Sequence, residues 1–303
     1  MNHREIIAEF ARENGCIAGV SGADELTEIR GVLAAADTPF VRRDILARTE
    51  PERVFSGCKS IVALGVSYAK GFTPVDDGRP RGIQSVACAS RDYHAVLREK
   101  LEALANRLGL GFNHKIQVDT GPLVEREIAR RAGLGSYGLS HQLISPVLGS
   151  CFNIGLLMLG IEIAPDRPSP PKYAPCEGCG ACIEYCPGKA LARDGLLDWR
   201  RCVSYITQAR GELTPEDAAR MGIHVYGCDI CQQVCPANAG KAREYAGDME
   251  SVAPDLQRLI EMDDAEFARR YGNTPAAWLG PDIIRRNAGI ALGNLKASPN
   301  SGI

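Results

Sequence analysis

The sequence predicts an α/β body with helices on an open sheet, followed by a cysteine-rich module and a short helical C-terminal tail. Two observations on the 303-residue chain lead to this division. In the first half, segments with apolar residues at helical spacing alternate with short apolar runs, which is typical of helices packed on a sheet. Of the 12 cysteines, eight lie between Cys176 and Cys235, directly after a proline-rich stretch.

The elements of the body follow from these periodicities. Residues 3–13, 93–109 and 123–132 are expected to form helices, and residues 60–68, 115–119 and 152–159 are expected to form strands. Because helices separate the strands along the chain, we expect parallel neighbours in the sheet.

Domain boundaries are set by composition. Residues 164–175 contain five prolines in twelve positions, which prevents regular structure and stiffens the path of the chain. We therefore expect a body over residues 1–163, a proline-rich joint over 164–175, a cysteine module over 176–240 and a tail over 241–303. Residues 282–294 of the tail have the pattern of one helix.

The composition excludes several classes of protein. The 35 Lys and Arg residues are balanced by 37 Asp and Glu residues, which argues against a strongly basic nucleic-acid coat. The absence of an apolar run of about 18 residues argues against a membrane span. Because the first residues lack the layout of a signal peptide, we expect a cytoplasmic protein, and nothing in the pattern requires more than a monomer. In that compartment clustered cysteines indicate metal binding rather than disulfides.

The cysteine module carries two related runs. Residues 176–187 have the pattern C-x2-C-x2-C-x3-C-P, the bacterial ferredoxin run for a [4Fe–4S] cluster. Residues 228–236 repeat only the last three cysteines and the proline, so the missing ligand must come from elsewhere. Cys202 is the remaining cysteine inside the module. The pattern predicts a ferredoxin-like module with two [4Fe–4S] clusters.

The ligands can be assigned because the fourth cysteine of each run ligates the other cluster in such modules. The first cluster takes Cys176, Cys179, Cys182 and Cys235, and the second takes Cys202, Cys228, Cys231 and Cys186. The alternative is zinc, which usually closes with two C-x2-C units and four ligands and does not suit these eight cysteines. Outside the module, Cys16, Cys58, Cys88 and Cys151 are expected to be small buried residues.

A two-cluster module alone needs only about sixty residues, whereas about 170 residues precede this one. The body is therefore predicted to hold a second redox centre or a substrate. Asp119 is a candidate, because it ends a predicted strand and strand ends of α/β sheets open onto ligand crevices. A carboxyl group beside an apolar ligand would have a raised pKa and could carry a proton near neutral pH. The alternative is that Asp119 caps the helix predicted from residue 123.

Three histidines and several arginines remain to be considered. His94 either contacts a ligand or lies on the surface at the start of a helix. His141 and His224 could in principle ligate a metal, but a structural hydrogen-bonding role is expected for both. The arginine pairs could contact phosphate groups, although paired arginines on helices are more often solvated. These pairs are Arg130 with Arg131, Arg200 with Arg201, Arg269 with Arg270, and Arg285 with Arg286.

Several motifs, in this order and at this spacing, resemble those of the epoxyqueuosine reductases. The motifs are RDYHAVLR at 91–98, VDTGPLVER at 118–126, AGLG at 132–135, CVSYITQ at 202–208 and YGCDICQQVCP at 226–236. The resemblance extends from about residue 5 to about residue 294. It implies that the tail is the shortened beginning of the helical repeats with which members of this family continue.

The resemblance also implies a function. A cobalamin would be held between the body and the cluster module, and electrons would pass through the two clusters to cobalt. The reaction would convert epoxyqueuosine in tRNA to queuosine, with Asp119 as the proton donor and an external low-potential donor such as a flavodoxin or ferredoxin. The cobalamin contacts implied by the resemblance are Arg48, Ser85, Asp119, Ser140, Leu143, Ile154 and Ser204.

Two other functions stay open at this stage. The same corrinoid and iron–sulfur chemistry could act on a different substrate, such as an organohalide or another epoxide, as in a reductive dehalogenase. The chain could instead be an electron-transfer iron–sulfur protein without cobalamin. Uptake of cobalamin would distinguish both corrinoid enzymes from the electron-transfer protein. Epoxyqueuosine-containing tRNA, compared with unmodified tRNA, would distinguish the epoxyqueuosine reductase from a corrinoid reductase with another substrate.

Overall fold

The computed structural model describes residues 2–36, 44–69, 71–73, 76–111, 113–241 and 246–297. Its contacts divide the chain into two compact units. The first consists of Met1–Ser67, His94–Gly138 and Gln142–Ala174, and the second of Tyr68–Tyr93, Leu139–His141 and Pro175–Ile303. The first unit thus ends inside the predicted joint, whereas residues 68–93 of the predicted body group with the cysteine module.

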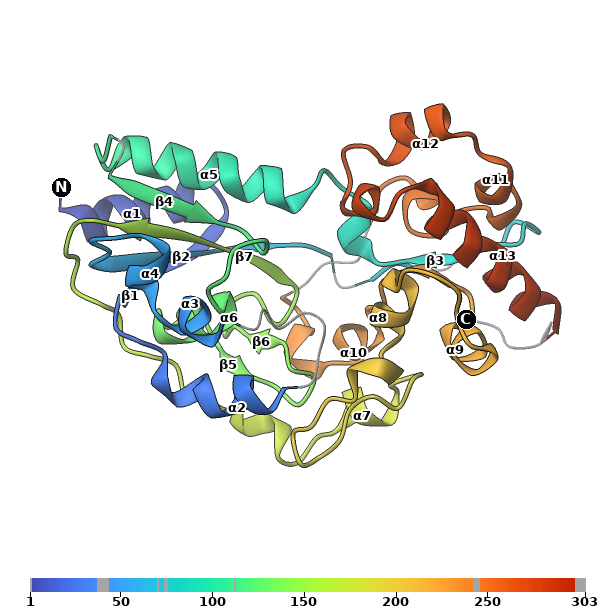
Figure 1. The fold of residues 1–303 in the computed structure, drawn as a ribbon, viewed down its shortest axis with the longest axis horizontal. Helices are drawn as coiled ribbons and strands as arrows, with labels where there is room; N and C mark the ends of the chain where they lie inside the picture. The colour runs from blue at the N-terminus through green and yellow to red at the C-terminus, as the bar shows by residue number, and fades with distance from the viewer. Residues whose placement is uncertain are drawn as a thin grey trace. The chain divides into compact units, whose positions relative to one another are not determined.

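The first unit is built on a four-stranded sheet with helices on it, and two further short strands form a separate antiparallel pair (Figure 1). Its helices are α1 (His3–Glu13), α2 (Arg30–Ala35), α3 (Ile45–Thr49), α4 (Pro51–Val54), α5 (Tyr93–Arg107) and α6 (Glu125–Arg131). Its strands are β1 (Cys16–Gly22), β2 (Ser60–Ser67), β4 (His114–Gln117), β5 (Ser136–Tyr137), β6 (Leu143–Ile144) and β7 (Phe152–Leu159). The six elements predicted in the body are confirmed within a few residues at each end.

The direction of the strands differs from the prediction. The sheet has the order β1-β2-β7-β4, and each neighbouring pair is antiparallel. The expectation of parallel neighbours was wrong because an apolar run reports burial but not strand direction. The elements predicted from the sequence also did not include β1, because its sequence CIAGVSG contains glycines that weaken a strand pattern. Ser67 at the end of β2 pairs with Phe152, and Gln117 at the end of β4 pairs with Leu156. The two strands therefore run in the same direction, and both end toward the start of β7.

Both faces of this sheet are covered. On one face, Ile128 and Ala129 of α6 pack with Leu156 and other buried residues of β2 and β7. On the other face α5 crosses β7 so closely that a side chain at Gly155 would lie 2.8 Å from Leu101 Cδ1. Ion pairs from Arg107 join α5 to α1 on that side. This three-layer packing fixes the start of α5, the end of β4 and the start of α6.

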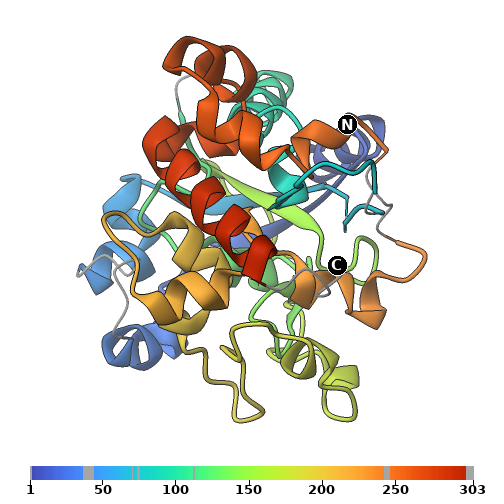
Figure 2. The same cartoon turned by 90° about the vertical axis from the view of Figure 1, so that its right-hand side faces the viewer.

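The second unit combines the cysteine module with the C-terminal helices. Its helices are α7 (Ala181–Glu184), α8 (Val203–Gln208), α9 (Pro215–Met221), α10 (Ile230–Gln233), α11 (Leu256–Glu261), α12 (Asp264–Tyr271) and α13 (Pro281–Ala297). A short parallel pair joins β3 (Ile83–Gln84) to β8 (His224–Tyr226). Helix α13 packs on α11 and β8 (Figure 2), and it confirms the helix predicted over 282–294.

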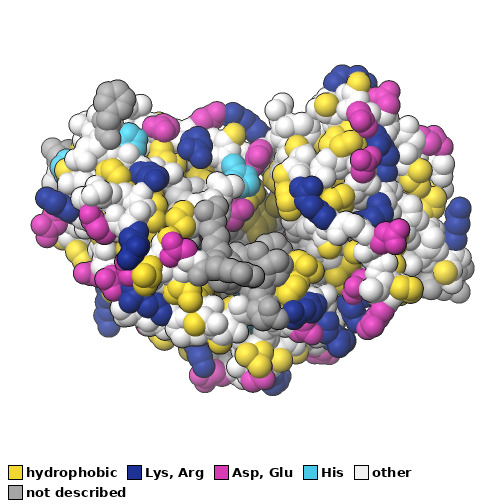
Figure 3. Space-filling model, viewed as in Figure 1, with side chains coloured by type: hydrophobic (Ala, Val, Ile, Leu, Met, Phe, Trp, Pro, Cys, Tyr) yellow, Lys and Arg dark blue, Asp and Glu magenta, His cyan; other side chains and the backbone are white. Residues whose placement is uncertain are grey.

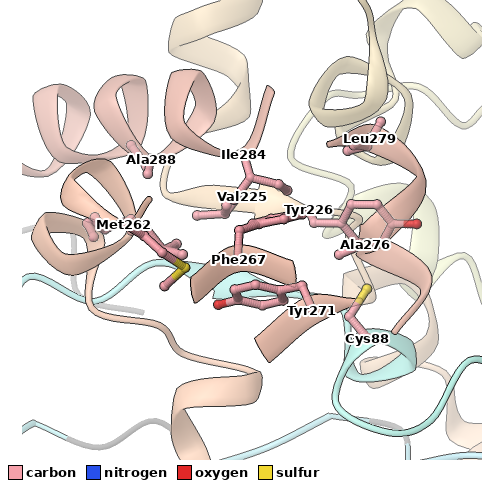
Figure 4. Packing of buried hydrophobic residues seen from close by; sticks show 13 residues of the cluster. Cys88, Val225, Tyr226, Met262, Phe267, Tyr271, Ala276, Leu279, Ile284 and Ala288 are labelled. Atoms are coloured by element: carbon pink, nitrogen blue, oxygen red, sulfur yellow. The ribbon is translucent and has the colours of Figure 1, made fainter. Parts of the chain in front are cut away.

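An apolar core holds these helices together. Figure 4 shows Phe267 and Tyr271 of α12, Ile284 of α13 and Val225 of β8 pointing into one cluster, with Cys88 at its edge. On the face drawn in Figure 3, Lys and Arg side chains are interspersed with Asp and Glu side chains. Among the described helices, none combines the length and apolar character that a membrane crossing requires.

Candidate active site

Asp119 lies on a loop of the first unit that leaves β4 and enters α6. Its φ angle is 57°, in the left-handed region that residues with a Cβ atom rarely adopt. Its side chain is 63% exposed, which leaves the carboxyl group accessible from solvent. Residues held in such sparsely populated conformations cluster at active sites, where the surrounding structure maintains them.

His94 faces this carboxyl group. It is the second residue of α5, and its Nε2 atom lies 3.4 Å from Asp119 Oδ2. The histidine side chain is 31% exposed, so it is partly shielded while the aspartate is not. The fold therefore brings together the predicted acid and a histidine from a separate element, and either member of the pair can hold a proton.

Two further residues brace the loop, and sequence reasoning did not single them out. The Asp119 backbone N–H donates to Glu125 Oε1 at 2.6 Å. Gln117 Nε2 donates to the Leu123 carbonyl at 2.9 Å and to Glu125 Oε1 at 3.1 Å, while its Oε1 accepts from Leu123 N–H at 3.1 Å. Glu125 stood in the motif VDTGPLVER, but nothing in that motif indicated that its side chain reaches back to Asp119.

Glu125 has an unusual acidity. Burial raises the pKa of its carboxyl group from 4.5 to about 7, and the neighbouring charge of Asp119 adds to this rise. The hydrogen bond from Gln117, the Asp119 N–H and the charge of His94 act in the opposite direction. Burial has the largest effect because it penalises the ionised form.

The alternative role of Asp119 as a helix cap is wrong. Helix α6 begins at Glu125, its N-cap residue is Val124, and no side chain caps it. Asp119 lies outside the capping position, and its own backbone N–H is bound by the first residue of the helix. Asp119 therefore does not cap this helix.

In the second unit, four thiols come together as one group. Burial raises the pKa of Cys182 to about 11, and the charges of Cys176, Cys235 and Cys179 raise it further. Burial also raises the pKa of Cys235, with added contributions from Cys176 and Cys179. Cys235 of the second run therefore lies near enough to the first run for the charges of these thiols to act on one another.

The other four thiols form a second group beside the first. Burial raises the pKa of Cys228 to about 12, with added effects of Asp229, Cys202 and Cys186. Ala190 and Leu191 form a small apolar core with Cys186, and Cys202 and Cys231 pack against it. The Ala190 N–H donates to Cys186 Sγ at 3.3 Å. Ionised thiols that lie this close repel one another. The positively charged iron ions of an iron–sulfur cluster offset this repulsion when the thiolates bind them.

A buried acid, also missed by sequence reasoning, ties this region to the segment before α5. Asp229 accepts hydrogen bonds from Ser85 Oγ and from Val86 N–H, both at 2.7 Å. Burial raises its pKa to about 6. Nearby, His224 is buried, its Nδ1 lies 3.1 Å from the Met221 carbonyl, and burial lowers its pKa to about 4. This is the structural role predicted for His224.

The residues implied as cobalamin contacts are divided between the units. Arg48, Leu143 and Ile154 belong to the first unit, and Ser85, Ser140 and Ser204 belong to the second. Leu143 is buried in the core under α6, whereas Arg48, Ile154 and Ser204 are partly exposed. Ser85 donates to Asp229, and Ser204 Oγ accepts from Gln208 Nε2 at 3.2 Å.

The arginine pairs make intramolecular contacts. Arg130 and Arg131 pair with Glu127 and Glu28, and Arg285 pairs with Asp282. The Arg200 guanidinium lies 4.3 Å from the centre of the Trp199 ring. Of the four cysteines outside the module, Cys88 and Cys151 are buried as predicted, whereas Cys16 and Cys58 are only partly buried.

Comparison with known proteins identifies the family. A family model for the 4Fe–4S double cluster binding domain matches residues 175–238, and a model described as epoxyqueuosine reductase QueG, DUF1730, matches residues 48–120. The chain is 36% identical over 290 residues to an epoxyqueuosine reductase of Lactococcus garvieae, covering 91% of this chain and 82% of the relative. This chain belongs to the epoxyqueuosine reductase family. The cysteine module therefore binds [4Fe–4S] clusters, and the zinc alternative is wrong.

Two solved structures of this family of oxidoreductases are similar to the chain. One is an epoxyqueuosine reductase with a tRNA-Tyr epoxyqueuosine-modified tRNA stem loop, at a TM-score of 0.89 and 32% identity. The other is the Bacillus subtilis enzyme with an aspartate catalytic loop swung out of the active site, at a TM-score of 0.87 and 31% identity. Each comparison covers 98% of this chain and 82% of the solved chain.

Proposed function

We propose that this chain is a cobalamin-dependent reductase that converts epoxyqueuosine to queuosine in tRNA. The observation that carries the proposal is the exposed Asp119 carboxyl group, held beside His94 on a loop with strained backbone. An aspartate also lies on the catalytic loop of the Bacillus subtilis relative, and another relative binds the modified stem loop.

The chemistry defines what the protein must contribute. Reduction of an epoxide to an alkene takes two electrons and two protons, and the oxygen leaves as water. When bound, the two clusters and the cobalamin supply the electrons. Asp119 Oδ2 delivers one proton to the departing oxygen, and solvent supplies the second. His94 Nε2, 3.4 Å away, forms an ion pair with the Asp119 carboxylate when the histidine is protonated. The exposure of Asp119 lets solvent return its proton before the next turnover.

In the proposed set of cluster ligands, the fourth cysteine of each run binds the cluster held by the other run. Cys176, Cys179, Cys182 and Cys235 hold one cluster, and Cys186, Cys202, Cys228 and Cys231 hold the other. The grouping of the thiols supports this, since the charges that raise the pKa of Cys182 come mainly from its own set. Among the charges that raise the pKa of Cys231 is also that of Cys182, so the two sets adjoin. Adjoining clusters let an electron pass from one to the other.

The residues proposed to hold cobalamin fit its chemistry. Cobalamin presents an apolar ring fringed by amide groups. Ile154 offers partly exposed apolar surface, Ser204 a hydroxyl group, and Arg48 a guanidinium group. Asp119 offers an exposed carboxyl group. Leu143, Ser85 and Ser140 are buried, so they would support the site from beneath. The Ser85 hydroxyl donates to Asp229 and accepts from the Ala87 N–H at 3.3 Å, so its orientation is fixed by the surrounding chain.

The partners follow from the reaction. The substrate is tRNA, which places the enzyme in the cytoplasm. An external low-potential carrier such as a flavodoxin or ferredoxin supplies the electrons, and the enzyme acts as a monomer. Because the net charge is only −2, binding of tRNA relies on local contacts and on the modified base rather than on a general positive field.

Anaerobic titration with cob(II)alamin tests this function. The iron–sulfur-reconstituted chain is titrated while absorbance and the cobalt electron paramagnetic resonance spectrum are recorded. Stoichiometric binding with an altered cobalt spectrum is expected. Lack of binding with both clusters intact would favour an electron-transfer protein. Binding without reduction of the modified stem loop would favour a corrinoid reductase with another substrate.

A further inference from the structure

We propose that Glu125 is a positioning residue, whose Oε1 atom anchors the Asp119 backbone and thereby sets the direction of the Asp119 carboxyl group. This inference rests on the proposed function of Asp119 as the proton donor. It concerns a residue that touches neither the epoxide nor a cluster, and it explains how a loop with an unfavourable backbone conformation is maintained.

The anchor is one oxygen atom with two donors. Glu125 Oε1 accepts from Asp119 N–H at 2.6 Å and from Gln117 Nε2 at 3.1 Å. The same Gln117 side chain holds the far side of the loop through two bonds with the Leu123 backbone. The side chains of Glu125 and Gln117 therefore hold the loop between β4 and α6 by hydrogen bonds at two places, at Asp119 near its start and at Leu123 near its end.

The backbone of Asp119 needs such a tie. A φ of +57° is unfavourable for a residue with a Cβ atom and persists only when neighbouring groups hold it. Inside the loop, Thr120 N–H donates to the Val118 carbonyl at 2.6 Å, which is a tight local turn. Loss of the Glu125 acceptor would leave the Asp119 N–H without its protein partner and allow φ to relax, which would redirect the carboxyl group.

Gly121 shows how closely the loop fits this brace. A Cβ atom at that position would lie 2.1 Å from Gln117 Cδ and 2.1 Å from Gln117 Oε1. The loop therefore passes directly over the Gln117 amide, with no room for a side chain. Displacing Gln117 from within the loop offers a second way to break the brace that leaves Glu125 unchanged.

The contacts distinguish anchoring from proton transfer. The hydrogen bond to Glu125 comes from the backbone N–H of Asp119, which is an anchoring contact and not a path for a proton to the Asp119 carboxyl group. A carboxylate oxygen accepts hydrogen bonds, and the amide oxygen of glutamine can accept them at the same place, although more weakly because it is neutral. Glu125→Gln therefore keeps the acceptor and removes the charge, whereas Glu125→Ala removes both.

The test compares Glu125→Ala, Glu125→Gln and Gly121→Ala in the reconstituted full chain, with the exposed Glu162→Ala as the matched control. Two properties are measured: the amide hydrogen exchange of residues 118–124, and kcat and KM for the modified stem loop. For Glu125→Ala we expect exchange at Asp119 to rise about tenfold or more. We expect its kcat to fall about 10²-fold through misplacement of the acid, with KM little changed. Glu125→Gln and Glu162→Ala should stay near wild type in both measurements.

The outcomes separate the possibilities. Wild-type exchange and kcat in Glu125→Ala would overturn the anchoring role, as would an equally severe loss in Glu125→Gln. If Glu125→Ala does not fold, Gly121→Ala decides: faster loop exchange with lower kcat supports the brace, and unchanged values overturn it. Exchange does not depend on turnover, so a wild-type chain that fails to reduce the stem loop would refute the proposed function while the anchor is still tested.

Discussion

The cysteine module and the Asp119 loop reach their chemistry in different ways. The module takes its eight proposed ligands from one stretch of chain, and each thiol is at least partly buried. The loop draws on three elements, with His94 from α5, Gln117 from β4 and Glu125 from α6, and it leaves its acid largely exposed. Metal ligation is thus encoded in local spacing, whereas the acid depends on tertiary hydrogen bonds.

The two regions should therefore fail differently. Repulsion among ionised thiols is offset by the iron they bind, so loss of a ligand affects both the cofactor and the surrounding fold. The Asp119 loop is held by a few hydrogen bonds next to a well-packed sheet. Changes there should affect turnover more than stability, and the following predictions test this contrast.

The largest effect is expected from Cys228→Ser. Its thiol lies deep in the second group, where burial raises the pKa to about 12 without iron. We expect iron content to fall by about half and turnover to become undetectable, because one cluster is lost from the electron path. Iron analysis and stem-loop turnover measure this. Cys16→Ser, outside the module, should keep its iron, and a Cys228→Ser protein with full iron content would contradict the ligand assignment.

A smaller but specific effect is expected from Asp119→Asn. Asparagine tolerates the left-handed backbone and is similar in size, so the loop should stay in place. We expect turnover to fall about 10²–10⁴-fold through loss of the proton donor, with cobalamin binding and iron content unchanged. Single-turnover kinetics provide the measurement. Wild-type turnover in this variant would remove Asp119 from the mechanism.

Leu156→Ala should show the opposite pattern. Leu156 is fully buried in β7 beneath α6, and its truncation leaves a cavity. The free energy of unfolding should fall by about 2–5 kcal/mol, with kcat of the folded protein little changed. Denaturant titration measures the first quantity. A stable variant with strongly reduced kcat would indicate that the sheet core and the loop are coupled.

The pH dependence of stability isolates Glu125. Its pKa is about 7 in the folded chain and 4.5 when exposed, so the folded state binds the proton more tightly. The stabilising contribution is complete below pH 4.5 and is lost as the pH rises through 7. Glu125→Gln lacks this loss and should be more stable than wild type at pH 8, by about 1–3 kcal/mol. The free energy of unfolding of both proteins is measured from pH 5 to 8. A difference between the two proteins that stays constant over this range would contradict the raised pKa of Glu125.

The smallest effect concerns the second unit. Both polar atoms of the Gln84 side chain are buried, without a hydrogen-bond partner among the described residues. A buried unsatisfied amide is costly, so Gln84→Met, similar in size, should raise the free energy of unfolding by about 1 kcal/mol. Denaturant titration again provides the measurement. A destabilised variant would mean that the amide is satisfied in solution, for example by a buried water molecule.

The same contrast explains what the sequence could predict. Helices 3–13 and 93–109 and the strand at 152–159 were predictable because their apolar spacing is local. The double-cluster module was predictable because its cysteine spacing is local, whereas the assignment of each cysteine to one cluster stays a prediction. The antiparallel order of the strands was not predictable, because strand direction depends on which strands pair. Strand β1 was not predicted because its glycines weaken the strand pattern.

The candidate site was predictable only in part. Asp119 stood out because it follows a strand, although the crevice argument assumed a parallel sheet that the structure does not have. The contact with His94 and the anchor by Glu125 depend on how α5 and α6 pack on opposite faces of the sheet. No spacing along the chain reports such contacts. Asp229 was overlooked for the same reason, since its partners Ser85 and Val86 lie far away in sequence.

Cobalamin-dependent reduction of the epoxide can be measured on the reconstituted chain itself. The reconstituted chain is incubated anaerobically with a low-potential reductant and an epoxyqueuosine-modified tRNA stem loop, with and without cobalamin, and the nucleoside is identified by mass. The account predicts that the base loses one oxygen atom only when cobalamin is present. Unchanged epoxide with both clusters and cobalamin bound and reduced, or equal conversion without cobalamin, would contradict it.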